Sequence, residues 1–128
     1  MRRDVLLYLS GPISPKNGFS IETNVASALR VFLECLKLGI PAFCPHLSAI
    51  FPSSHLEITY ATWMDYDYAI IDRCTDVLML AGWQNSFGAQ KEMAYAQRHN
   101  KPIFYSLDDF AQQWPAPQPE DEATEHIK

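Results

Sequence analysis

The sequence predicts an α/β fold in which a parallel sheet of four to five strands is covered by helices on both faces. Four short apolar runs alternate with longer segments whose apolar residues recur every three to four positions. The connections are short, and repeated strand–helix units of this kind wind into parallel sheets. With 128 residues, 48% of them apolar, the chain has the size of one compact domain.

The first half of this pattern contains two strands and one helix. Residues 4–10 form an apolar run that does not alternate, which is typical of a strand buried on both faces. Residues 22–38 follow the helical period, and Gly39 stands where a C-terminal cap is expected. Residues 40–44 form the next strand. The apolar face of the helix is expected to contain Val25, Leu29, Phe32, Leu33 and Leu36.

The second half repeats the alternation. A helix is predicted over residues 58–74, followed by a buried strand over 76–80. Ser86 is expected to cap a helix over residues 87–99. A strand over 102–105 and a short helix over 107–114 complete the domain, which is therefore predicted to span residues 1–114.

The last segment, residues 115–128, has a different composition. It contains three prolines and four acidic residues against one lysine, and it therefore holds most of the net charge of −5. Such a segment buries too little apolar surface to order itself, so a disordered acidic tail is predicted.

Composition also excludes several classes of function. The body of the chain has no basic excess, which argues against a partner that is a nucleic acid polymer. No apolar stretch is long enough to cross a membrane and no leader pattern is present, so a cytoplasmic protein is expected. Three cysteines without CxxC spacing favour neither a disulfide framework nor a zinc site, and no cofactor is expected.

A ligand cleft is expected beyond the carboxyl ends of the strands, where the strand order reverses. That rule selects the loops over residues 10–20, 45–52 and 81–86. Ser86 and Gly88 stand at a helix N-terminus, whose free N–H groups favour anionic or hydroxyl-rich ligands, although such a serine often does no more than cap.

Two acidic residues stand on helix faces where a charge is unexpected. Glu92 shares a face with the small residues Gly88 and Ala96, so its carboxylate would point toward the strand ends, although a solvated surface glutamate fits the same pattern. Asp67 lies on the face of Ile71, which should be buried, and serves either a local hydrogen bond or a function. Two carboxylates that converge on one cleft suggest nucleophile and acid chemistry at a glycosidic bond.

Other polar and aromatic residues lie at the same edge. His46 is either a ligand contact or an ordinary loop histidine, and no second histidine at metal spacing accompanies it. Tyr8 and Ser10 end the first strand, and Gly11 would let the backbone approach a ligand. Trp83 is a candidate for base stacking, although aromatic residues more often belong to the core.

These residues together resemble the nucleoside 2-deoxyribosyltransferase-like superfamily. The resemblance covers about residues 5–106 and is closest to an uncharacterised bacterial and phage branch; the Ser-x-Gly-x-x-x-Glu spacing is also similar to that of the 2′-deoxynucleoside 5′-phosphate N-hydrolases. The matching motifs are Tyr8-Leu-Ser-Gly-Pro-Ile13, Pro45-His46-Leu47, Trp63-x-x-x-Asp67, Cys74 and Gly82-Trp83-x-x-Ser86-x-Gly88-Ala89-x-x-Glu92-x-x-x-Ala96.

The resemblance implies a flavodoxin-like, three-layer fold and a retaining reaction at C1′ of a nucleoside or nucleotide. Glu92 matches the nucleophile that forms a glycosyl ester, and Asp67 matches the acid that assists departure of the base. In the family, one loop holds the sugar or its 5′ end, and Ser10, Gly11 and Ile13 match that loop. A helix N-terminus serves the same purpose, and Ser86 and Gly88 match it. Tyr8 and His46 match cleft-lining positions, and a homo-oligomer is expected because relatives complete their sites with a neighbouring subunit.

Two features of the chain depart from the family pattern. Pro12 and Ser14 replace the serine and arginine that grip the 5′-phosphate in the N-hydrolases, and Lys16 is the nearby cation. Thr75 replaces an aspartate that usually follows the cysteine. A non-catalytic nucleotide-binding module is therefore the alternative to an enzyme, and a phosphoribohydrolase-like or NAD-cleaving enzyme is a third candidate that lacks the expected glycine-rich loop.

Overall fold

A four-stranded parallel sheet forms the centre of the computed structural model, which describes residues 4–15, 18–50 and 57–115. The spatial order of the strands is β2-β1-β3-β4, with β1 at Leu7–Ser10, β2 at Ala42–Phe43, β3 at Asp76–Met79 and β4 at Ile103–Phe104. This confirms the predicted α/β class and places all four predicted strands. Some predicted features lie outside the described residues: positions 116–128 of the predicted tail, Lys16, and positions 51–52 of the second predicted loop.

The two central strands are longer and more buried than the two edge strands. All four residues of β1 pair with β3, from Leu7 opposite Asp76 to Ser10 opposite Met79, and all eight are buried. The edge strands have two half-buried residues each. They are shorter than the apolar runs that predicted them, because ladder pairing ends before the run does.

Each of the four α-helices in the described residues is preceded by a serine or threonine whose side chain accepts a backbone N–H from the first turn. The helices are α1 (Ile21–Lys37), α2 (Tyr60–Arg73), α3 (Phe87–Arg98) and α4 (Leu107–Ala111). The predicted cap of α3 is confirmed, since Ser86 Oγ accepts from Ala89 N at 3.2 Å. Two predicted loops contain 3-10 helices, η2 (Pro45–Ile50) and η4 (Trp83–Asn85).

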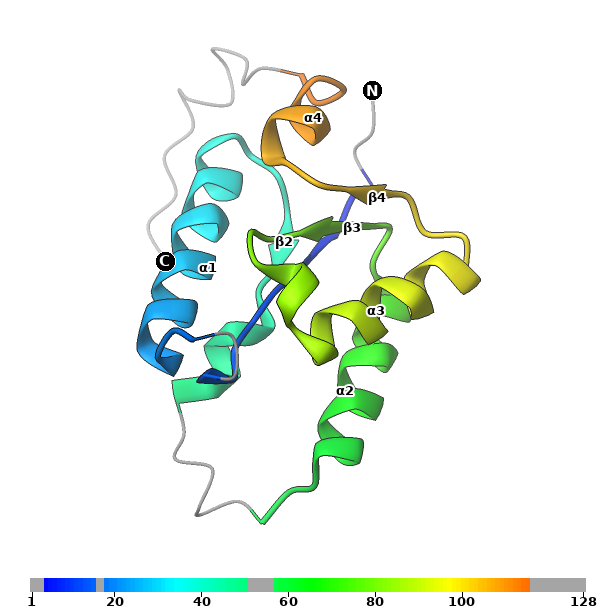
Figure 1. The fold of residues 1–128 in the computed structure, drawn as a ribbon. Coiled ribbons are helices and arrows are strands. Elements are labelled where there is room, and N and C mark those ends of the chain that lie inside the picture. The colour runs from blue at the N-terminus through cyan, green and yellow to red at the C-terminus, as the bar shows by residue number, and fades with distance from the viewer. Residues whose placement is uncertain (1–3, 16–17, 51–56, 116–128) are drawn as a thin grey trace, which may run out of the picture.

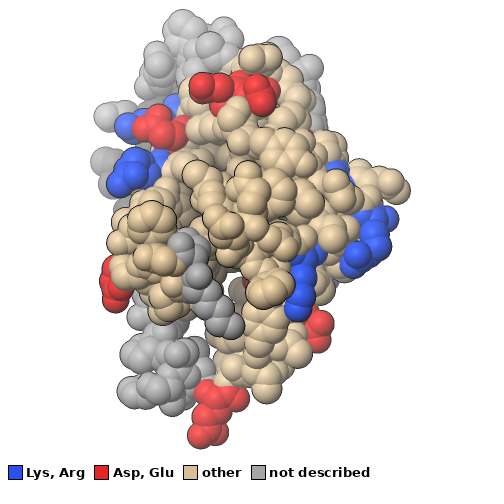
Figure 2. Space-filling view, viewed as in Figure 1, with Lys and Arg blue, Asp and Glu red and all other residues tan. Residues whose placement is uncertain are grey.

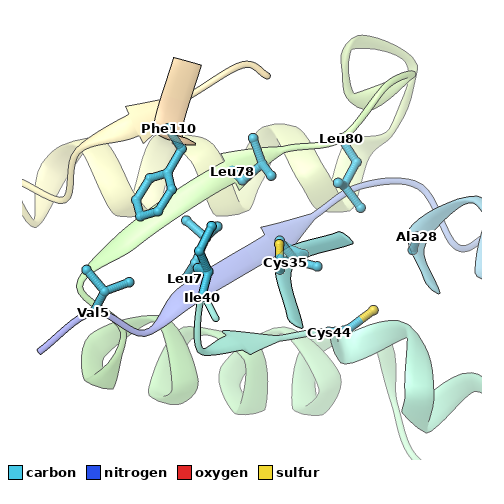
Figure 3. Packing of buried hydrophobic residues seen from close by; sticks show 10 residues of the cluster. Val5, Leu7, Ala28, Cys35, Ile40, Cys44, Leu78, Leu80 and Phe110 are labelled. Atoms are coloured by element: carbon cyan, nitrogen blue, oxygen red, sulfur yellow. The ribbon is translucent and has the colours of Figure 1, made fainter. Parts of the chain in front are cut away.

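Helices cover both faces of the sheet, so the fold has three layers (Figure 1). On one face, α1 and α4 pack on Leu7, Leu9, Leu78 and Leu80. Figure 3 shows this cluster, to which Phe110 of α4 contributes a ring. On the other face, α2 and α3 pack through Ile71, Ala89 and Ala96 on Tyr8, Val77 and Met79.

The predicted apolar face of α1 is partly wrong. Its fully buried positions are Asn24, Ala28 and Cys35, whereas Leu33 is 55% and Leu36 49% exposed. Small side chains allow α1 to approach the sheet closely, and larger apolar residues then flank the contact instead of forming it.

The distribution of charge and the length of the helices bear on the predicted partners. Charged side chains of both signs are scattered over the face in Figure 2, and among the described residues on that face they form no continuous basic surface. In the part of the chain that the structure describes, no helix combines the length and apolarity needed to cross a bilayer.

Candidate active site

A cavity of about 400 Å³ opens at the carboxyl ends of β1 and β3. The chain passes from β1 to β2 on one side and reaches β3 on the other, so this is the point where strand order reverses. Two of the three predicted loops line the cavity, together with the first turns of α2 and α3. The lining residues are Pro12, Ser14, Tyr60, Asn85, Ser86, Phe87, Gly88 and Lys91.

Glu92 points inward from α3 and is 6% exposed. Its Oε1 accepts a hydrogen bond from Ser10 Oγ at 2.7 Å, and its Oε2 accepts one from Tyr8 Oη at 3.2 Å. Both donors lie on β1, the strand that α3 faces. The solvated surface glutamate that the sequence pattern allowed is therefore wrong.

Asp67 of α2 meets Glu92 although 25 positions separate them in the sequence. Its carboxyl group is half-buried, and its interactions with Glu92 and Tyr8 shift its pKa. Because two carboxylates cannot both be ionised in direct contact without strong repulsion, the pair holds a proton between them. The structure therefore brings together four of the predicted site residues: Glu92, Asp67, Tyr8 and Ser10.

Burial dominates the ionisation of this pair. It raises the pKa of Glu92 well above the ordinary value, and the hydrogen bond and charge of Asp67 raise it further, against the hydrogen bonds from Ser10 and Tyr8. Burial also raises the pKa of Asp67, while hydrogen bonds from Glu92 and Tyr8 lower it. Burial and the neighbouring carboxyl group therefore favour the protonated form of Glu92, whereas the resemblance implies that Asp67 is the acid.

Tyr60 connects the cavity to the carboxyl pair. Its ring lines the cavity, and partial burial, followed by the charges of Glu92 and Asp67, raises the pKa of its phenol. Lys91 Nζ lies 5.0 Å from the centre of the same ring, within the range of a cation–π contact. The two carboxyl groups thus lie within electrostatic range of the cavity wall, although neither belongs to its lining.

The loop after β1 is held by packing and by backbone hydrogen bonds. A Cβ atom on Gly11 would lie 2.7 Å from Leu80 Cβ, so glycine is required by the close approach of β3 and not by a ligand. The carbonyl oxygens of Ile13 and Ser14 accept hydrogen bonds from Asn24 Nδ2 at 3.1 and 3.2 Å. Ser14 lines the cavity, and Ile13 lies behind it as part of the support.

His46 also supports this loop, and it does not line the cavity. The side chain is buried, with Nε2 3.2 Å from the carbonyl oxygen of Pro12 and Nδ1 3.7 Å from Cys44 Sγ. Because a carbonyl oxygen only accepts, Nε2 carries the proton. Burial lowers the pKa of His46 to about 4, so the ring is neutral near pH 7.

The loop after β3 contributes Ser86 and Gly88 to the cavity, but not Trp83. A Cβ on Gly88 would lie 3.7 Å from Tyr60 Oη, in ordinary contact. Trp83 packs on the core between the sheet, α2 and α3, and its ring centre lies 5.8 Å from that of Tyr105. The structure thus assigns Trp83 to packing, the alternative that the sequence pattern allowed.

Sequence reasoning missed much of the cavity wall and its main support. Tyr60 stands seven residues before Asp67, at helical spacing, and this was the available signal for it. Asn24 stands four residues before Ala28 on the buried face, where a polar side chain suggests a specific partner. No comparable signal marks Asn85, Phe87 and Lys91, which are exposed.

Metal and thiol chemistry find little support among the described side chains. Over residues 4–15, 18–50 and 57–115, no group of three or more His, Cys, Asp or Glu side chains is arranged to hold a metal ion. All three cysteines are free and buried, and burial raises the pKa of Cys35 and of Cys74 to about 11.

Comparison with known proteins gives one family. A family model described as "Domain of unknown function (DUF4406)" matches residues 5–105. No curated protein matches the chain. The matched segment contains β1, Asp67 and Glu92, and it extends over more than three quarters of the sequence. The chain therefore belongs to the DUF4406 family.

Proposed function

We propose that the protein cleaves or transfers the N-glycosidic bond of a nucleoside or nucleotide through a covalent glycosyl ester on Glu92. The observation that carries the proposal is the buried pair of Glu92 and Asp67 beside a cavity at the strand switch point. The resemblance to the nucleoside 2-deoxyribosyltransferase-like superfamily supports the same chemistry.

In the first step, a carboxylate oxygen of Glu92 attacks C1′ of the sugar. The bond between C1′ and the base nitrogen breaks, its electron pair leaves with the base, and Asp67 donates a proton to that base. The two carboxyl groups interact with each other, which leaves no room for the water that inverting glycosidases hold between carboxyl groups roughly 6.5–9.5 Å apart, and this favours retention.

The shared proton matches what this step consumes. The pair carries one proton and one negative charge, and the reaction uses one acid and one nucleophile. Attack requires Glu92 as a carboxylate, so the shared proton must lie on Asp67 when the substrate is bound. A base nitrogen that accepts a hydrogen bond from Asp67 would favour that transfer.

In the second step, an acceptor attacks C1′ and releases Glu92 as a carboxylate. Water as acceptor gives hydrolysis, and a second base gives transfer; the proton that the acceptor loses returns to Asp67. The cavity volume is in the range of small-molecule sites. The polar side chains of Ser14, Asn85, Ser86 and Lys91 line the cavity, so the sugar or its substituents would lie against them.

The test is a panel of deoxynucleosides, deoxynucleotides and ribonucleotides, each with and without a free acceptor base, followed by chromatography of the released base. Base release that disappears in Glu92→Ala and persists in Glu34→Gln, an exposed carboxyl of α1, supports the proposal. Base exchange that outpaces hydrolysis identifies a transferase. Release that is unchanged in Glu92→Ala contradicts the proposal. Sedimentation of the same samples tests the homo-oligomer that the resemblance implies.

A nucleotide-binding module is the second candidate. Two observations favour it: Pro12 and Ser14 replace the phosphate-binding serine and arginine, and burial raises the pKa of Glu92. Calorimetric binding of one member of the panel without turnover under any condition would support the module and exclude the enzyme.

A further inference from the structure

Ser10 is fully buried at the end of β1, and both its backbone and its hydroxyl group have partners. It pairs with Met79 in the sheet, and its carbonyl oxygen accepts from Leu80 N at 2.7 Å. Its hydroxyl group donates to Glu92 Oε1, also at 2.7 Å. Ser10 does not belong to the cavity lining, and its hydroxyl group is already bound to Glu92.

The hydrogen bond from Ser10 favours the charged form of Glu92. The other groups that face Glu92 are Asp67, Tyr60 and Tyr68 from α2 and Tyr8 from β1. Among these, Tyr8 also donates, at the longer distance of 3.2 Å, and the charge of Asp67 opposes ionisation. Ser10 therefore makes the shorter of the two hydroxyl hydrogen bonds that stabilise a carboxylate here.

We infer that Ser10 is a positioning residue for Glu92 and not a substrate ligand: from a rigid central strand, its hydroxyl group fixes the orientation of the carboxyl group and stabilises it as a carboxylate. The carboxylate is needed twice, as the attacking group and as the group that leaves in the second step. The catalytic consequence rests on the proposed function, whereas the effect on the ionisation of Glu92 does not.

The first measurement is therefore independent of turnover. Carboxyl ¹³C resonances, with Glu92 assigned by comparison with Glu92→Gln, are followed across pH in the wild type and in three variants. In Ser10→Ala the titration of Glu92 moves to higher pH. In Ser10→Cys, which replaces the hydroxyl group by a weaker donor of similar shape, it moves less. In Ser106→Ala, which removes the hydroxyl group that caps α4, it does not move.

The second measurement uses whichever substrate the panel identifies. Ser10→Ala moves the acidic limb of the kcat/KM profile to higher pH and lowers kcat on that limb about tenfold, as expected for a lost hydrogen bond to a charged group, with little change in KM. Ser10→Cys gives an intermediate profile, and it replaces Ser10→Ala in both measurements if that variant does not fold.

The outcomes separate this inference from the proposed function. An unchanged Glu92 titration in Ser10→Ala overturns the inference, and a raised KM with an unshifted pH profile would do so by making Ser10 a substrate ligand. If the wild type releases no base from any substrate, the proposed function fails, and the ¹³C titration still decides the role of Ser10.

Discussion

The buried carboxyl group of Glu92 lowers the stability of the fold. Glu92 is almost completely buried next to a second carboxyl group, and its hydrogen bonds from Ser10 and Tyr8 do not offset the loss of solvation. Groups that are unfavourable for folding and kept at a concave site are typical of functional residues. This arrangement makes the pH dependence of stability a direct probe of the pair.

Glu92→Gln is expected to raise the free energy of unfolding at pH 8 by about 1–2 kcal/mol. Folding raises the pKa of Glu92, so the folded protein retains a proton that the unfolded chain releases above about pH 4.3. Stability therefore falls as pH rises through the folded-state pKa. Glutamine remains neutral, can accept from Ser10 and can donate to Asp67. Urea unfolding between pH 7 and 9 measures the difference.

The same series in Glu34→Gln controls for a general effect of removing a negative charge, because Glu34 is exposed on α1. A Glu92→Gln variant that is less stable than the wild type throughout this range would show that the carboxyl group is not destabilising.

Three elements converge on the loop after β1, which forms one wall of the cavity. Asn24 of α1 binds the carbonyl groups of Ile13 and Ser14, His46 of η2 binds that of Pro12, and β3 packs against Gly11 through Leu80. These hydrogen bonds and this packing contact determine the conformation of the loop before any ligand binds.

Asn24→Ala is expected to lower the free energy of unfolding by about 1–3 kcal/mol, because two partly buried hydrogen bonds lose their shared donor. Hydrogen exchange at the amides of Ile13 and Ser14 should become faster. Ser27→Ala, at an exposed position of the same helix, should change neither quantity. Unchanged exchange in Asn24→Ala would indicate that α1 does not hold the loop.

Alanine is expected to have opposite effects at two glycines of the site. Gly11→Ala should destabilise by about 1–3 kcal/mol, because the new Cβ would meet Leu80 Cβ, which cannot rotate away. Gly88→Ala should stabilise by about 0.5–1 kcal/mol, because α3 gains a better helix former with room for its methyl group. Thermal unfolding of both variants checks the signs, and a stabilised Gly11→Ala would contradict the packing.

The whole molecule is expected to be most stable between two opposing titrations. Stability falls toward alkaline pH because of Glu92, and it falls toward acidic pH because of His46. Folding lowers the pKa of His46 from 6.5 to about 4, so the unfolded chain binds the proton first and stability is lost as pH decreases through this range.

Protonation of His46 should therefore remove up to about 3 kcal/mol of unfolding free energy between pH 6.5 and pH 4. In His46→Gln this part of the pH dependence disappears, even though the variant is less stable near pH 7 because its packing is altered. His99→Gln, at an exposed histidine, retains the wild-type slope. Denaturant unfolding at several pH values measures the slopes, and equal slopes in wild type and His46→Gln would exclude this role.

The parallel sheet and its helical layers followed from the alternation of apolar patterns, because buried parallel strands and amphipathic helices have different periods. Helical spacing identified Asp67 and Glu92 as candidates but left open whether either carboxyl group points inward. The face of α1 was misjudged because Asn24, Ala28 and Cys35, which form the contact, carry weak apolar signals. The burial of His46 depends on how η2 folds back onto Pro12, and local sequence does not encode that contact.

Alternate residues of β1 face opposite sides of the sheet and have different roles. Leu7 and Leu9 enter the core under α1, whereas Tyr8 and Ser10 face the opposite side and reach Glu92. A single-residue deletion upstream in this strand would therefore exchange the two sets and ruin core and site at once. Substitutions at Tyr8 and Ser10, in contrast, leave the α1 side of the sheet intact. A protein engineer could therefore change the residues of this strand that contact Glu92 without altering the hydrophobic core under α1.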